Sequence, residues 1–560
     1  KLNRMRRMPM YRHVKRAVVD IETNLAWSHI WVAGVVYENG EHVLATTPDQ
    51  LYKALSGIDE IIMHNGIGFD LPRLRETWGY VWNRSVVDTC CWSRLLEPNL
   101  DGGHSLKNLA LLAGEELKDD FDPAEFDHGL TQRMQDYCLQ DCRATWSVYR
   151  YLESKHKRLG FSDASLENEQ EVRRLTTKQE ENGFMFNFHR GCELFNSHEQ
   201  RMKEIEHELQ EVFPPIVEER WSEKTGKQLK DKVTVFNPGS RQQVAARLEE
   251  KGAVWKTLTE TGKPKVDETT LAELTAIPEA ALVLEYLTLS KRLGMLRSWI
   301  DAVADDGRIH GRVNTCGAIT NRMTHSKPNL AQIPSDKEYR ECFTVPEGYK
   351  LVGVDASGLE LRMLAHYMND EEYTNQILHG DIHTANQKAA GLATRDQAKT
   401  FIYAFLYGAG NEKIGQIVGG GERKGGQLKK AFLEATPSLA RLIDKVQEVA
   451  ANEGVLPGLD GRKIHVRSQH AALNTLLQSA GAIVMKYALV IASKKLDNMN
   501  LPYRLVAQVH DEFQLEVPED YADRVGVIFR NAIKQAGVDL KMRCPLAGDI
   551  NSGLTWADTH

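Results

Sequence analysis

The sequence lacks the features that mark several classes of protein. Its eight cysteines contain no CxxC pair, so we expect neither a disulfide framework nor a zinc finger. We expect the protein to reside in a reducing compartment. No apolar run reaches ~18 residues, and the best candidate, from Gly481 to Ala492, is interrupted by Lys486, so we expect no membrane span. With 42 glycines and 18 prolines in 560 residues, the chain is neither collagenous nor of low complexity.

What is present fits a large folded protein. Hydrophobic residues make up 42% of the chain and charged residues 26%, and 560 residues correspond to about three or four domains. The formal net charge is −7, so any nucleic-acid site must be a local basic surface. Residues 1–16 carry seven Lys or Arg and no acid, which indicates a basic tail: a nucleic-acid-binding arm, a targeting segment or a solvated end.

Hydropathy patterns predict an α/β multidomain fold. The strand-like segments AVVDIE, HIWVAGVVY and EIIMHN alternate with helical stretches up to about residue 150. Residues 165–300 are mostly helical, apart from a polar stretch from Ser222 to Lys232. YKLVGVD then predicts a strand and LVAQVHDEFQLEV predicts two strands around a tight turn. The Gly-rich segment 419–426 lacks the spacing of a phosphate loop and is predicted to be a flexible loop.

Four acids and a tyrosine near the N-terminus are candidates for a metal site. Asp20 and Glu22 stand two apart in a strand, so both side chains emerge on one face of the sheet. Asp70 follows HNGIGF, while Tyr137 and Asp141 stand four apart, side by side on a helix. No basic cluster lies near these acids in the sequence, so gathering them requires cations. Two magnesium-type ions about 3.5–4 Å apart would do so and would support phosphodiester hydrolysis.

A second set of candidates lies in the C-terminal half. Asp355 ends the strand YKLVGV, and Asp511 occupies the tip of the predicted hairpin. Between them, Arg395, Lys399, Tyr403 and Tyr407 recur every four residues along RDQAKTFIYAFLYG and share one helical face. Such a face offers cations that suit a triphosphate and aromatic rings that suit a sugar or base.

The N-terminal motifs resemble those of a known enzyme class. DIET, HNGIGFD and YxxxD, in this order, resemble the DEDDy type of 3′–5′ exonuclease that proofreads for DNA polymerases. The resemblance implies an RNase H-like domain in which Asp20, Glu22, Asp70 and Asp141 hold two Mg²⁺ ions. Tyr137 would position the attacking water. Asp88 matches a further acid of such domains, and we interpret it as structural.

The C-terminal motifs resemble the family A DNA polymerases, closest to the short-tailed phage replicative type. GVDASGLELR, RDQAKTFIYAFLYG and VHDEFQLEV match the three polymerase motifs in the family's order, and TNRMTHSKPNLAQIPS, GDIHT and FNPGSR also match. The resemblance implies an exonuclease domain followed by a right hand. Its parts would be the basic tail at 1–16, the exonuclease at 17–165, the thumb at 166–315, the palm at 316–370 and 456–560, and the fingers at 371–455.

The resemblance also implies roles for individual residues. Two Mg²⁺ ions, or Mn²⁺ as a substitute, would bind Asp355, Asp511 and the backbone of Ala356, with Glu512 nearby. Arg395, Lys399 and His383 would bind the nucleotide phosphates, and Lys399 would protonate pyrophosphate. Glu360 would exclude a ribose 2′-hydroxyl. The residues expected to contact the template or the primer terminus are Tyr407, Arg322, Gln478 and His510.

Tyr403 and the absence of a large thumb insertion lead to two more specific expectations, one on nucleotide selection and one on partners. Tyr403 stands where many bacterial relatives carry Phe, so its hydroxyl is expected to permit ready use of dideoxynucleotides. Thioredoxin-using phage enzymes carry a large insertion in the thumb, whereas this chain has only the polar stretch from Ser222 to Lys232. We therefore expect no thioredoxin partner. From the length of 560 residues we also expect no 5′ nuclease domain of the kind found in full-length bacterial polymerase I.

The resulting hypothesis is a proofreading, template-directed DNA polymerase of phage replication that acts on primer–template DNA and dNTPs. We expect a monomer. Its expected location is the cytoplasm of an infected bacterium, with the mitochondrion as the alternative. A phage helicase–primase or single-strand binding protein is a candidate partner. A gap-filling repair polymerase and an exonuclease with an inactive polymerase half remain open. A non-enzymatic single-strand binding protein would not need the clustered acids, and Glu360 disfavours an RNA polymerase.

Overall fold

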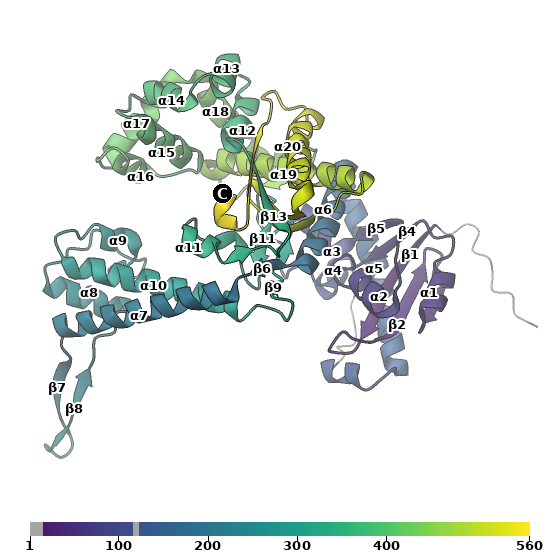
Figure 1. The fold of residues 1–560 in the computed structure, drawn as a ribbon, viewed down its shortest axis with the longest axis horizontal. Coiled ribbons are helices and arrows are strands. Elements are labelled where there is room, and N and C mark those ends of the chain that lie inside the picture. The colour runs from purple at the N-terminus through teal and green to yellow at the C-terminus, as the bar shows by residue number, and fades with distance from the viewer. Residues whose placement is uncertain (1–14, 116–121) are drawn as a thin grey trace, which may run out of the picture.

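The computed structural model describes residues 15–115 and 122–560, so the basic tail predicted at 1–16 lies outside the described residues except for its last two. Figure 1 shows an N-terminal α/β domain, a long helical arm that ends in a hairpin, and a central sheet topped by a group of helices. The predicted mixed α/β architecture is confirmed.

The N-terminal domain is built on a five-stranded sheet of order β3-β2-β1-β4-β5. Its strands are β1 (Arg16–Thr23), β2 (Ile30–Tyr37), β3 (His42–Ala45), β4 (Glu60–Met63) and β5 (Ser85–Asp88). Its helices are α1 (Pro48–Ala54), α2 (Asp70–Trp78), α3 (Thr89–Leu96), α4 (Leu106–Leu112) and α5 (Gln132–Leu159). β1 lies at the centre, antiparallel to β2 and parallel to β4, and α5 packs against both β1 and β2. The three strands predicted from AVVDIE, HIWVAGVVY and EIIMHN are confirmed.

The helical arm carries a separate apolar core. Its elements are α7 (Phe188–Val212), β7 (Ile216–Trp221), β8 (Gln228–Thr234), α8 (Arg241–Glu250), α9 (Glu268–Ala272) and α10 (Pro278–Ile300). α7 and α10 lie side by side and the β7–β8 hairpin extends from the far end of the arm (Figure 1). The polar stretch at Ser222–Lys232 is thus the tip and second strand of this hairpin.

Helix α6 (Asp163–Asn182) falls in the range predicted as thumb, but it packs against α3, α19 and β16 rather than against the arm. A buried ion network fixes it there. Glu169 accepts hydrogen bonds from Lys486 at 2.8 Å and from Arg462 at 3.1 Å, and all three side chains are almost fully buried. Because the charges are paired, their burial is tolerated. The network ties α6 to the C-terminal half of the chain.

The central sheet has the order β16-β17-β13-β18, with all neighbours antiparallel. Its strands are β13 (Tyr349–Ala356), β16 (Arg504–Val509), β17 (Glu512–Pro518) and β18 (Gly548–Gly553), and its helices are α12 (Leu359–Met368), α19 (Ala472–Asn498) and α20 (Ala522–Asp539). Short elements link this sheet to the arm: β6 (Phe184–Phe186), β9 (Arg308–Ile309), β10 (Arg312–Asn314), β11 (Thr324–Ser326), α11 (Lys337–Arg340) and β12 (Phe343–Thr344). The strand and hairpin predicted around Asp355 and Asp511 are confirmed.

The remaining helices form the group above the sheet in Figure 1. They are α13 (Glu371–His379), α14 (Ile382–Ala390), α15 (Arg395–Leu406), α16 (Asn411–Gln416), α17 (Glu422–Ala435) and α18 (Pro437–Glu453), followed by the hairpin β14 (Val455–Pro457) and β15 (Lys463–His465). The flexible loop predicted at 419–426 is wrong in its second half, which is the start of α17. There a Cβ on Gly425 would lie 1.7 Å from the Asn411 carbonyl oxygen, so glycine permits close packing of α17 on α16.

Within the part of the chain that the structure describes, one helical segment, Gln469–Asn498, is long and apolar enough to cross a membrane by length and composition. However, 83% of its most apolar window is buried inside the protein. This segment contains α19, which packs against α20 and α12. Its apolar surface is therefore accounted for by the core of the C-terminal half.

Candidate active sites

Asp355 and Asp511 meet at one end of the central sheet. Asp355 on β13 stands opposite Glu512 on β17, and the Ala356 N–H donates a 2.9 Å hydrogen bond to the Asp511 carbonyl oxygen. His510 forms the turn before β17 with a φ of 55°, a backbone conformation that is uncommon for a residue other than glycine. The tertiary fold thus joins two motif acids that are far apart in the sequence.

Burial and like charge raise the pKa values of the acids in this cluster. Burial first, and then the charges of Asp511 and Glu512, raise the pKa of Asp355 to about 7. Burial and the charge of Glu360 raise the pKa of Asp511 to about 6. Carboxylates held together in this way favour a bound divalent cation, which removes their repulsion. The donor set therefore fits Mg²⁺.

Sequence reasoning missed Asp549, which joins this cluster. It stands opposite Asp355 on β18 and accepts a 2.6 Å hydrogen bond from Ser357 Oγ. Nothing in the segment GDINSG distinguishes this acid from any strand residue, and only strand pairing brings it close. Glu512, by contrast, is buried and engaged elsewhere: Trp556 Nε1 donates to its carboxylate at 2.6 Å, and His560 Nδ1 lies 2.8 Å from it.

The predicted face of cations and aromatics is present on α15. Arg395 and Lys399 are exposed on its first turns, and the rings of Tyr403 and Tyr407 are near-parallel at 6.5 Å. Tyr407 itself is the residue that ends the helix. Arg395 forms a 2.7 Å ion pair with Asp381, which holds the pKa of that carboxyl well below its usual range. The contact uses only Arg395 Nε, so the two Nη groups of the guanidinium can still donate to a ligand.

The remaining predicted residues lie around this face. His383 approaches Tyr403 from α14, with ring centroids 6.2 Å apart, and its Nδ1 is buried with no hydrogen-bond partner among the described residues. Arg322 and His510 line one small pocket together with His325 and Gln508. Gln478 does not line this pocket. It lies on α19, one helical turn before Ala482, and Ala482 does line the pocket.

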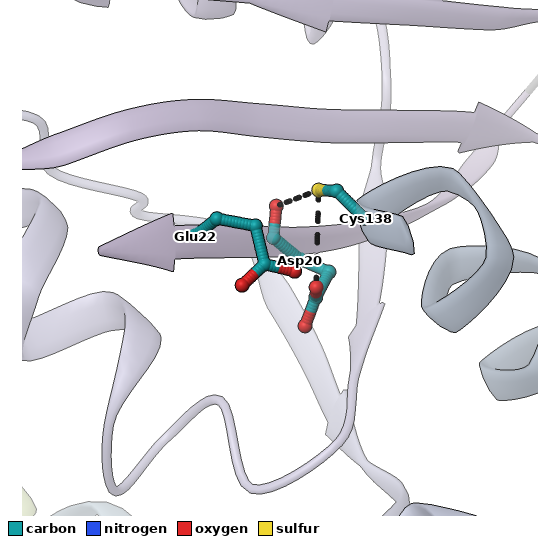
Figure 2. Close-up of side chains that lie close together, drawn as sticks. All are labelled: Asp20, Glu22 and Cys138. Carbon is teal, nitrogen blue, oxygen red and sulfur yellow. Dashed lines mark hydrogen bonds between the residues drawn. The ribbon is translucent and has the colours of Figure 1, made fainter. Parts of the chain in front are cut away.

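The N-terminal acids form a second cluster. Figure 2 shows the Asp20 and Glu22 carboxylates on the same side of β1, with Cys138 reaching toward Asp20 from α5. Ligand atoms of these three residues lie within 4.8 Å of one another. Cys138 Sγ is 3.6 Å from the Asp20 carbonyl oxygen and 3.9 Å from its carboxylate. Sequence reasoning missed Cys138, although its position three residues before Asp141 puts both on one face of α5 and was a signal.

Asp70 and Asp141 complete this cluster. Asp70 is the buried first residue of α2, and the Tyr137 hydroxyl donates a hydrogen bond to Asp141 one turn away on α5. Burial is the largest cause in raising all four pKa values: Asp20 well above its usual range, Glu22 to about 9, Asp70 to about 7 and Asp141 to about 6. Asp141 Oδ1 is buried with no hydrogen-bond partner among the described residues. An uncompensated carboxylate set with such an orphan oxygen fits Mg²⁺ as well.

Asp88 plays the structural part expected of it. Its carboxylate accepts hydrogen bonds from the backbone N–H groups of Asn65, Ile67, Cys90 and Cys91 at 3.0–3.1 Å. It caps α3 and holds the loop that precedes Asp70.

Comparison with known proteins agrees with this architecture. The model of DNA polymerase family A matches residues 200–558. The chain is 34% identical to the DNA-directed DNA polymerase of Enterobacteria phage T3, over 89% of this chain and 92% of the relative. It is 33% identical to that of Escherichia phage T7, over 97% of this chain and 100% of the relative. The chain therefore belongs to DNA polymerase family A.

A solved structure shares the whole fold. The POL domain of Pol1 from M. smegmatis, in a complex with DNA primer-template and dNTP, matches 97% of this chain with a TM-score of 0.82 and 21% sequence identity. The match covers 96% of that chain. At 21% sequence identity, this similarity establishes a shared fold, that is, the same arrangement of helices and strands.

Proposed function

We propose that this family A enzyme extends a primer 3′ end with dNTPs by two-metal phosphoryl transfer, and that its N-terminal domain is an RNase H-like, DEDDy 3′–5′ exonuclease that proofreads. The observation that carries the proposal is the presence of two separate clusters of carboxylates, one in each half of the chain, in which burial raises the pKa values. Each cluster has the chemistry of a two-metal site.

In the polymerase site, Mg²⁺ ions held by Asp355, Asp511 and the Ala356 backbone would activate the primer 3′-hydroxyl and neutralise the triphosphate. The protein's own groups prepare the substrates. Arg395 and Lys399 bind the phosphates from α15, with His383 beside them, and Lys399 gives its proton to the departing pyrophosphate. The adjacent DNA contacts come from Tyr407, Arg322, Gln478 and His510.

In the exonuclease site, Mg²⁺ ions held by Asp20, Glu22, Asp70 and Asp141 would activate water and stabilise the leaving 3′-oxygen. Tyr137 positions that water. Its hydroxyl proton is directed at Asp141, so its oxygen can accept a hydrogen bond from the attacking water. This orients the water's lone pair toward the phosphorus.

Replication of phage DNA in an infected bacterium is the biological role that the T3 and T7 relatives support. Substrates are primer–template DNA and dNTPs, as in the complex of the M. smegmatis polymerase. A helicase–primase or single-strand binding protein is a candidate partner. We propose no thioredoxin partner, because the arm carries only the short β7–β8 hairpin where a binding insertion is expected.

The test is a gel assay with a 5′-labelled primer–template and Mg²⁺, with and without dNTPs. We expect Asp355→Ala to lose extension and keep primer shortening, and Asp20→Ala to do the reverse. EDTA should abolish both reactions and Mn²⁺ should restore them. Extension that survives in Asp355→Ala would contradict the polymerase site, and shortening that survives in Asp20→Ala would contradict the exonuclease site. Wild-type protein that shortens but never extends would support the alternative of an inactive polymerase half.

A further inference from the structure

The N-terminal acid cluster contains a thiol beside its carboxylates. Cys138 Sγ lies 3.9 Å from Asp20 Oδ2, and ligand atoms of Asp20, Glu22 and Cys138 all lie within 4.8 Å of one another (Figure 2). Among the described residues, no other three Asp, Glu, His or Cys side chains come this close together. The four metal ligands proposed above for this site are all carboxylates, so the thiol is an additional donor of a different chemical kind.

Packing of α5 on the sheet fixes the position of this thiol. Asp20 on β1 pairs with Gly34 on β2, and Cys138 Sγ lies 3.6 Å from the Asp20 carbonyl oxygen. A Cβ on Gly34 would lie 2.8 Å from Cys138 Sγ and 3.0 Å from Cys142 Sγ, so glycine leaves the room that both sulfur atoms occupy. Because Cys138 is fully buried, its thiol is held beside the Asp20 carboxylate.

Glu22 gives an independent sign that this cluster binds a ligand. Its side chain is only 6% exposed and makes no hydrogen bond or ion pair with any described residue. Figure 2 shows its carboxylate on the same side of β1 as that of Asp20. A buried carboxylate without a partner is costly, and a bound cation supplies the missing partner.

The donor set distinguishes between two kinds of divalent cation. Mg²⁺ takes oxygen ligands, so it uses the carboxylates and leaves the thiol free. Zn²⁺ takes thiolate and carboxylate ligands together, usually in a tetrahedron. With Zn–S at about 2.3 Å and Zn–O at about 2.1 Å, a sulfur and an oxygen ligand lie about 3.6 Å apart in such a site. The observed 3.9 Å between Cys138 Sγ and Asp20 Oδ2 is only about 0.3 Å longer, so a small side-chain rotation makes the fit.

We propose that Asp20, Glu22 and the Cys138 thiolate form a Zn²⁺ site that competes with Mg²⁺ for the N-terminal cluster. Binding releases the thiol proton to solvent, and a water molecule takes the fourth position on the metal. Because Asp20 and Glu22 are shared with the Mg²⁺ ions, bound Zn²⁺ displaces Mg²⁺ and stops primer shortening. No described cysteine joins the acids around Asp355 in such a group, so this inhibition is specific to the N-terminal site. The inhibition rests on the proposed exonuclease, whereas the metal site does not.

Cys138→Ser tests the site against a matched control, Cys91→Ser. Cys91 lies in the same domain, on α3, and is also buried. Its Sγ lies 3.6 Å from the Glu169 carbonyl oxygen, the same distance as between Cys138 Sγ and the Asp20 carbonyl oxygen. Each variant replaces one of the eight free cysteines by a hydroxyl, but Cys91 is not in the group of close ligand atoms.

Metal binding is measured directly with Cd²⁺ on the full chain without DNA. A bond between Cd²⁺ and a thiolate gives an ultraviolet charge-transfer band that carboxylates do not give. We expect wild type and Cys91→Ser to show the same band and Cys138→Ser to lose it. We also expect the apparent Kd for Zn²⁺, from competition with a chromophoric chelator, to rise at least about tenfold in Cys138→Ser alone. Equal bands in all three proteins, or no band in any of them, would overturn the inference.

Inhibition of primer shortening is the second readout. In the gel assay with Mg²⁺, we expect Cys138→Ser to need about tenfold more Zn²⁺ for half-inhibition than wild type or Cys91→Ser. The Zn²⁺ concentration that inhibits extension should be the same in all three proteins. Equal inhibition of shortening in all three would show that the thiolate does not hold the inhibiting ion. Wild-type protein that shortens no primer would refute the proposed exonuclease, while the Cd²⁺ titration would still decide the metal site, so the two failures are distinguishable.

Discussion

The hydroxyl of Tyr407 donates a 3.0 Å hydrogen bond to Glu360 Oε1, and Arg322 Nη2 approaches the same oxygen at 3.6 Å. Three residues predicted to act on the sugar, the template and the primer terminus are therefore joined through one carboxylate atom. Glu360 is held from one side by Tyr407, at the end of α15, and from the other by Arg322, just before β11. Its position is consequently fixed before a nucleotide arrives.

Replacing this carboxylate should relax the choice of sugar. We expect Glu360→Ala to raise the incorporation of ribonucleotides relative to deoxynucleotides at least about tenfold, because space opens beneath the sugar. Glu360→Gln should keep most of the discrimination, since it retains the volume and an oxygen for Tyr407. Single-turnover incorporation with each nucleotide measures the ratio. Equal ratios in wild type and Glu360→Ala would show that Glu360 does not read the sugar.

Tyr403 provides a second test of nucleotide selection. We expect Tyr403→Phe to lower dideoxynucleotide incorporation, relative to deoxynucleotides, by about tenfold, the value of one hydrogen bond in a half-buried site. Tyr521→Phe, which removes a hydroxyl outside the site, is the control. Competition between a dideoxynucleotide and its deoxy counterpart gives the ratio. The hypothesis is wrong if that ratio does not change.

Gly68 should be intolerant of a side chain. A Cβ there would lie 1.9 Å from Arg173 Nη2, and that guanidinium cannot readily retreat because it is buried and bonded to Glu180 and to the Val313 carbonyl oxygen. We expect Gly68→Ala to cost about 1–3 kcal/mol of stability and to slow primer shortening more than extension. Chemical denaturation and the gel assay measure the two effects.

Gly294→Ala is the matched control for that change. Among the described residues, and apart from the nearby backbone of α10 itself, no atom lies within 4 Å of a Cβ at this position, so the substitution should stabilise the helix by about 0.5–1 kcal/mol. If Gly68→Ala proved as stable as Gly294→Ala, the close approach of Arg173 to the Gly68 backbone would have no energetic weight.

His64 predicts a loss of stability in mild acid. Burial is the main cause that lowers its pKa to about 4, and its Nδ1 lies 2.9 Å from Thr89 Oγ1. The unfolded chain takes up this proton near pH 6.5, so the stability contribution is complete above pH 6.5 and is lost as the pH falls toward 4. At pH 5 the loss amounts to about 2 kcal/mol.

Denaturant unfolding of the N-terminal domain at pH 7.5 and pH 5 measures this loss. We expect His64→Asn, which has no titrating group, to lose less stability than wild type between the two pH values. A pH dependence identical in both proteins would assign the acid sensitivity to other residues.

The sequence alone predicted the features that depend on local order. The strand that carries Asp355, the hairpin that carries Asp511 and the pairing of Tyr137 with Asp141 follow from periods of two and of 3.6 residues. These periods set which side chains share a face, whatever the rest of the chain does. The motif order then placed the acids in two groups, and the structure brings each group together.

Only the tertiary structure shows which side chains from distant segments of the sequence become neighbours. Asp549 joins Asp355 only because β18 pairs with β13, and Cys138 joins Asp20 only because α5 packs on β1. Likewise, Arg173 and Arg312 meet at Glu180 only because α6 packs against β10. Such neighbours depend on sheet pairing and on buried interactions across hundreds of residues, which leave no periodic signal in the sequence.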